Sequence, residues 1–151
     1  MVPHGRTWLF FAVIIGAVAL ASVGCDVEQH PERNSDDSYR TNAMEIPLNR
    51  VIIDNVTSFG GDQTDWKYFT VPSDGIIKLL FNFDNEDSQP EVYLVDDVGR
   101  VLSALDKPES SGPVLRQMSF EAKPTNYYLH ILVQEGETDY SVEIIHLIRP
   151  K

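Results

Sequence analysis

Short runs of alternating hydrophobic and polar residues, separated by turn sequences, fill the chain from about residue 44 onward. The clearest run is 76–83, where Ile77, Leu79, Phe81 and Phe83 alternate with a more polar set, as in a half-buried strand. Strands are expected at about 50–56, 66–71, 76–83, 91–95, 100–105, 114–121, 127–134 and 139–147. Seven or eight strands at this spacing predict an all-β fold, a jelly-roll-like antiparallel β-sandwich, with a barrel as the alternative.

The N-terminus carries a different pattern. Arg6 precedes a continuous apolar run over 8–20, and small residues then lead to Cys25. A basic start, an apolar middle and small residues at the end are typical of a cleaved signal peptide. The alternatives are an uncleaved membrane anchor, because 8–24 has the minimum length for a spanning helix, and a plain secreted form.

Gly24-Cys25, approached through residues 20–23, resembles a bacterial lipoprotein signal. The resemblance implies that residues 1–24 are removed and that the Cys25 thiol carries a lipid that anchors the protein to a membrane. Ser22 departs from the pattern, because that family usually has leucine there. Cys25 is the only cysteine, so no disulfide is expected.

The resemblance places the protein in the bacterial cell envelope, on the outer or the inner membrane and on its periplasmic or surface side. Asp26 resembles the signal that retains enterobacterial lipoproteins in the inner membrane. Residues 25–43 are acidic and polar without a helical or strand period, which predicts a flexible tether. The domain is then 44–148, with a tail at 149–151.

Net charge and composition exclude one class of partner and one class of chain. The net charge is -11, and a phosphate backbone repels so acidic a surface, so nucleic acid is not expected as a partner. The hydrophobic content of 42% is that of a globular domain, which excludes a wholly disordered chain.

Four motifs, in order along the chain, resemble the bacterial pre-peptidase C-terminal domain family. They are Gly61-Asp62, Asp65-Trp66 and Val71-Pro72 within residues 60–72; Tyr93-Leu94-Val95-Asp96 with Gly99; Tyr127-Tyr128-Leu129; and Tyr140-Ser141-Val142. The resemblance covers about 46–147 and implies a β-sandwich without catalytic machinery, a domain usually attached to exported proteases. Glu91 departs from the pattern, since the family often has aspartate there, and no glycine precedes Tyr127.

The residues themselves also argue against an enzyme. The sequence has no Gly-x-Ser-x-Gly elbow and no His-Glu-x-x-His spacing. His130 and His146 fall on different predicted strands, and a zinc site needs three or four converging ligands. We therefore expect no catalytic residues, and no cofactor except a candidate structural calcium ion.

The candidate calcium ligands are Asp62 and Asp65, which flank the start of the 66–71 strand. Some collagen-binding sandwiches related to the resembled family place calcium there, and Glu45 or Asp54 could contribute a ligand here, although nothing in the sequence shows that they reach the site. The alternative is that both aspartates only accept hydrogen bonds in the turn. The acidic loop 84–87 fails the EF-hand pattern, because the twelfth position is a valine.

Three aromatic residues suggest a binding surface. If Phe69 and its alternate neighbours face the core, then Trp66, Tyr68 and Tyr93 point to the opposite side. Exposed aromatic side chains can stack on sugar rings or pack against peptide, unless loops or the first strand cover them.

The sequence thus predicts a non-catalytic envelope lipoprotein whose sandwich binds or scaffolds a protein or an extracellular polymer such as a polysaccharide. The alternative function is an accessory or regulatory subunit acting in trans on an exported enzyme or an envelope complex.

Overall fold

The computed structural model describes residues 36–105 and 115–148, which form nine strands and two short 3-10 helices. The strands are β1 (Met44–Glu45), β2 (Val51–Thr57), β3 (Thr64–Thr70), β4 (Gly75–Phe83), β5 (Glu91–Val95), β6 (Val101–Ala104), β7 (Leu115–Ala122), β8 (Asn126–Leu132) and β9 (Glu137–Ile148); the 3-10 helices are η1 (Arg40–Asn42) and η2 (Glu86–Ser88). Each of the eight predicted strands overlaps one of β2 to β9, and only the two-residue β1 was not foreseen.

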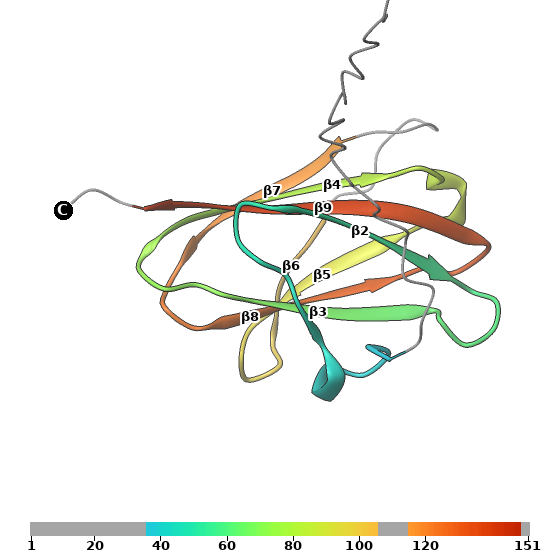
Figure 1. Ribbon diagram of the computed structural model, residues 1–151, viewed down its shortest axis with the longest axis horizontal. Coiled ribbons are helices and arrows are strands. Elements are labelled where there is room, and N and C mark those ends of the chain that lie inside the picture. Colours follow the sequence, from blue (N-terminus) through green and yellow to red (C-terminus); the bar gives the residue numbers. More distant parts are fainter. Residues whose placement is uncertain (1–35, 106–114, 149–151) are drawn as a thin grey trace, which may run out of the picture.

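The strands form two sheets that pack face to face (Figure 1). The five-stranded sheet has the order β1-β3-β8-β5-β6, and the four-stranded sheet has the order β2-β9-β4-β7. β1 pairs with β3 in parallel, and all the pairings among β2 to β9 are antiparallel. This division of eight strands between two sheets is that of a jelly roll, so the predicted β-sandwich is confirmed and the barrel alternative does not apply.

The core lies between the two sheets and follows the alternation in the sequence. Ile77, Leu79, Phe81 and Phe83 of β4 are all fully buried, while their neighbours on the strand face outward. The other sheet contributes the predicted inward sets of β3, β5 and β8, with Phe69 among them. Burial of these side chains is the main stabilising contribution to such a domain.

The packed domain begins earlier than the predicted boundary at residue 44. Asp37, which we assigned to the flexible tether, is 1% exposed, and its carbonyl oxygen accepts a 2.8 Å hydrogen bond from the backbone N–H of Trp66. The guanidinium of Arg40 donates to the carbonyl oxygens of Asp96 and Asp97. Through Asp37 and Arg40, residues 36–43 therefore pack on the sandwich and are not part of a flexible tether. Their contacts are polar and have no periodicity, so the sequence pattern did not reveal them.

The predicted signal peptide at 1–24, the predicted lipidation site Cys25 and the predicted tether up to residue 35 lie outside the described residues, as does the tail at 149–151. Within 36–105 and 115–148, no helix is long and apolar enough to cross a membrane.

Candidate functional site

The three predicted aromatic residues lie on the outer face of the five-stranded sheet. Trp66 of β3 pairs with His130 of β8, and His130 pairs in turn with Tyr93 of β5. The three rings therefore form one row across three adjacent strands, and each residue is half-buried. Tyr68 lies in the next row, paired with Tyr128. The sequence pattern identified the face correctly, but it did not include His130 among the candidates.

The rings contact one another closely. Trp66 and His130 stack with their centroids 4.2 Å apart and their planes 10° from parallel. Tyr93 lies 6.1 Å from His130 on its other side in the row, tilted by 33°. Burial lowers the pKa of His130, so its imidazole is neutral at pH 7 and packs as an uncharged ring.

The second aromatic row is partly covered by the N-terminal segment. The Arg40 guanidinium lies 4.3 Å from the centre of the Tyr128 ring, in a cation–π contact. The Tyr68 hydroxyl donates to the carboxylate of Glu45, in β1, at 3.4 Å. The covering that we considered as an alternative thus applies at Tyr68, whereas the Trp66–His130–Tyr93 row borders an open hollow.

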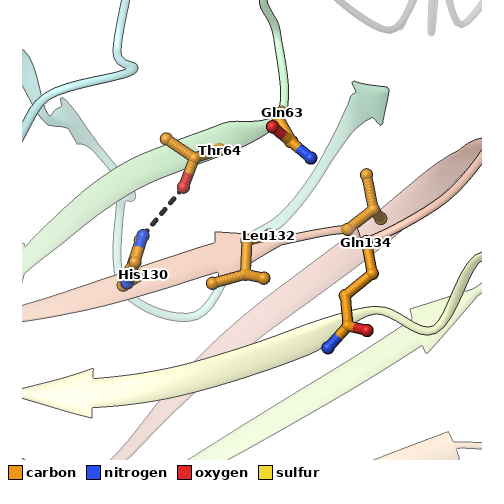
Figure 2. Close-up of a pocket in the computed structure, with 6 residues that line it drawn as sticks. Gln63, Thr64, His130, Leu132 and Gln134 are labelled. Atoms are coloured by element: carbon orange, nitrogen blue, oxygen red, sulfur yellow. Dashed lines mark hydrogen bonds between the residues drawn. The ribbon is translucent and has the colours of Figure 1, made fainter. Parts of the chain in front are cut away.

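The hollow has a volume of about 310 Å³ and lies over the ends of β3 and β8 (Figure 2). It is lined by Gln63, Thr64, His130, Leu132, Val133 and Gln134. The Thr64 hydroxyl and the His130 imidazole are hydrogen-bonded at 2.7 Å along one side. The Gln134 amide donates to the Glu91 carboxylate at 2.8 Å, and Glu91 also accepts from the Tyr93 hydroxyl. The hollow thus joins hydrogen-bonding side chains to His130, the middle ring of the aromatic row.

A buried cluster of charges occupies the opposite face of β3. Lys67 is 1% exposed, and its ammonium donates to the Asp37 carboxylate at 2.6 Å and to that of Asp54. The Asp65 carboxylate is 4.0 Å from the same nitrogen and accepts a 2.6 Å hydrogen bond from the Tyr140 hydroxyl. This Asp37–Asp54–Asp65–Lys67 group, called the Lys67 cluster below, ties the N-terminal segment to β2, β3 and β9.

Burial shifts the titration of the Lys67 cluster. It raises the pKa of Asp65 to about 8, although Lys67 and Tyr140 oppose the shift. Burial alone would lower the pKa of Lys67, but the surrounding carboxylates outweigh it and raise that pKa, so the ammonium stays charged. Asp62 lies nearby, and burial together with Asp37 and Asp54 raises its pKa to about 6. Neither carboxylate oxygen of Asp62 has a hydrogen-bond partner in the described part of the chain.

The predicted calcium ligands can now be placed. The carboxylates of Asp37, Asp54 and Asp65 lie within 4.8 Å of one another, a spacing that could hold a metal ion. The Lys67 ammonium already lies among them, however, so a cation bound to this triad would have to displace it. Asp62 is not in the triad, and calcium at Asp62 and Asp65 stays a prediction. From the sequence we did not identify Lys67 as a member of a site. Lys67 alternates with Phe69 and so falls on the inward face of β3, and a charged residue at an inward position was a signal that it has buried partners.

No assembly of catalytic groups stands out among the described residues. His130 lies on β8 and His146 on β9, which belong to different sheets. The only group of three metal-ligating side chains found there is the aspartate triad, and it contains no histidine.

Comparison with solved structures agrees with this fold. The chain is similar to the pre-peptidase C-terminal domain of a collagenase from Bacillus anthracis, with a TM-score of 0.55 and 24% identity, over 68% of this chain and 93% of that one. This likeness supports the resemblance in the sequence and establishes the fold alone.

Two further likenesses are more distant. A carbohydrate-binding module of Cellvibrio mixtus lichenase 5A, solved with cellotriose, has a TM-score of 0.41 and 13% identity over 66% of this chain and 88% of that one. PliG, a periplasmic inhibitor of g-type lysozyme from Aeromonas hydrophila, has a TM-score of 0.42 and 7% identity over 68% of this chain and 95% of that one. No protein-family model and no curated protein matches the chain.

Proposed function

We propose that this protein is a non-catalytic binding module of the bacterial cell envelope, anchored by a lipid on Cys25, which binds an envelope protein or an extracellular polymer. The observation that carries the proposal is the row of Trp66, His130 and Tyr93, whose middle ring, His130, lines the hollow. Aromatic side chains combine large rigid contact area with a polar edge, which makes them frequent anchors at binding surfaces.

The position of the row favours binding over a purely structural role. The hydrophobic core between the two sheets does not include these three side chains, because each of them points away from it. The docked N-terminal segment covers the neighbouring Tyr68 row and leaves this row beside open space.

The anchor is tested by metabolic labelling with palmitate. The wild-type protein should be labelled and recovered with membranes, while the Cys25→Ser variant should be neither. Equal labelling of the two proteins would refute the lipoprotein assignment, whatever the sandwich binds.

The binding role is tested by retention of the purified full-length protein on isolated envelope fractions. The double variant Trp66→Ala, Tyr93→Ala should unfold close to the wild-type temperature and be retained about thirtyfold more weakly. Phe59→Ala is the matched control, because Phe59 is an aromatic residue 69% exposed in the loop before β3. Equal retention of the double variant and the control would remove the aromatic row as the binding site.

The same retention experiment separates the two functions that the sequence left open. Recovery of one protein in stoichiometric amount with the wild type would favour an accessory or regulatory subunit. Retention that survives protease treatment of the envelope fraction would favour a polymer.

A further inference from the structure

We propose that the hollow beside the Trp66–His130–Tyr93 row binds an uncharged saccharide. This inference rests on the proposed binding function and specifies the class of ligand. The hollow unites amide groups, a hydroxyl and an aromatic ring around an apolar floor at Leu132 (Figure 2).

The polar groups suit a ligand that carries many hydroxyls. Gln63 and Gln134 are exposed at opposite sides of the hollow, and each amide offers both donors and acceptors. The Thr64 hydroxyl is already bonded to the His130 imidazole and can accept a further hydrogen bond, and the Gln134 amide keeps a free acceptor beside its bond to Glu91. A sugar hydroxyl can both donate and accept, so it can bond to the Gln63 amide and to these remaining groups without bringing a charge.

The aromatic side chains suit the apolar faces of sugar rings. His130 lines the hollow and is backed by the stacked indole of Trp66, which holds the imidazole in place. A rigid pair of rings loses little conformational entropy when a ligand packs against it.

Charge argues against anionic ligands. The six residues that line the hollow include no lysine or arginine, and the Glu91 carboxylate lies just beyond Gln134. The protein as a whole carries a net charge of -11. A phosphate or uronate group would therefore be repelled without finding a cationic partner. Glu91 already accepts hydrogen bonds from Gln134 and Tyr93, so it is engaged within the protein.

Sheet topology argues against an extended peptide. β8 lies between β3 and β5, and both of its edges are paired over the residues beneath the hollow. The backbone N–H of Val133 also bonds to the Gln63 carbonyl. A peptide that adds to a sheet needs a free strand edge, and this hollow lies over a central strand. Its volume is at the lower end of small-ligand sites, which span roughly 300–1,000 Å³, and suits about one or two sugar rings.

The test uses the full-length protein purified in detergent and titrated calorimetrically with soluble oligosaccharides. The neutral probes are a series of hexose and N-acetylhexosamine oligomers that includes cellohexaose and chitohexaose, and oligogalacturonate is the anionic probe. We expect binding to at least one neutral probe, little change in affinity between low and high salt, and no binding to the anionic probe.

Two variants locate the site. Trp66→Ala should weaken binding of the neutral probe at least about tenfold, and Gln134→Ala about threefold to tenfold through the lost hydrogen bond. The Phe59→Ala control should bind like the wild type. Gln134 is exposed, so its variant keeps the test decisive even where Trp66→Ala perturbs folding.

The outcomes also separate this inference from the proposed function. If no neutral probe binds while envelope retention still depends on Trp66 and Tyr93, the saccharide proposal is refuted and the proposed binding function is not. Loss of that retention on protease treatment overturns the saccharide in favour of a protein partner. If retention does not depend on the aromatic row at all, the proposed function is refuted, and so is the saccharide proposal that rests on it.

Discussion

Replacing Lys67 by methionine should destabilise the domain strongly. The ammonium is buried, bonds to the carboxylates of Asp37 and Asp54, and lies 4.0 Å from that of Asp65. Methionine fills much of the same volume but removes the only cation of the Lys67 cluster. Removing one partner of a buried ion pair typically costs about 3–5 kcal/mol, because the remaining charge is left uncompensated.

The same cost follows from the protonation that the variant needs. A carboxyl group with the ordinary pKa of 3.8 must bind a proton to stay buried without Lys67. Protonating one such group costs about 4.4 kcal/mol at pH 7 and about 1.6 kcal/mol at pH 5. We therefore expect the deficit of Lys67→Met to shrink by nearly two thirds between pH 7 and pH 5.

The assay is urea unfolding of the full-length protein in detergent at both pH values, with and without calcium. Lys78→Met is the matched control, because Lys78 is exposed on β4. If the Lys67 ammonium supplies the positive charge that the triad needs, calcium and chelators leave the wild type unchanged, and the calcium ion predicted at Asp62 and Asp65 does not bind. In Lys67→Met, calcium should recover part of the lost stability, because the triad of carboxylates is then free for a cation. If Lys67→Met is as stable as Lys78→Met, the cluster does not hold the fold as described.

Two further predictions concern the core and the pH dependence. Phe81→Ala should cost about 3–5 kcal/mol in unfolding free energy through the cavity it leaves, and an unchanged melting temperature would contradict the register of β4. Asp62→Asn should stabilise the domain by about 1–3 kcal/mol at pH 7, because it removes a buried charge without hydrogen-bond partners. The folded pKa of Asp62, about 6, lies above the ordinary 3.8, so its contribution to stability falls as pH rises from about 4 to 6. The stabilisation should accordingly vanish near pH 4, and a gain independent of pH would refute this cause.

The strands could be predicted because each buries one face, and a period of two records that directly. β4 shows this most clearly, with Phe81 and Phe83 inside and Asn82 outside. The same alternation assigned Trp66 and Tyr93 to one outer face. It could not show that His130 lies between them, because cross-strand register depends on pairing between distant segments.

Such patterns could not predict the Lys67 cluster. Its members come from the N-terminal segment, β2 and β3, and each is an ordinary polar residue in its own stretch of sequence. Only the fold brings Asp37 to Lys67. The calcium prediction included Asp65, which belongs to this cluster, but it did not anticipate a lysine ammonium among the carboxylates.

Strand β3 connects the docked N-terminal segment to the aromatic row. Lys67 binds the Asp37 side chain, while the backbone N–H of the adjacent Trp66 donates to the Asp37 carbonyl at 2.8 Å. Asp37→Ala should release this segment and expose the Trp66 amide, so its hydrogen exchange should accelerate at least about tenfold through local opening. The Phe81 amide, in the centre of the other sheet, is the internal control and should change only as far as global stability does. If both amides accelerate equally, the segment opens only when the whole domain unfolds. A Trp66 amide that exchanges at the wild-type rate would mean that the Asp37 side chain does not hold the segment in place.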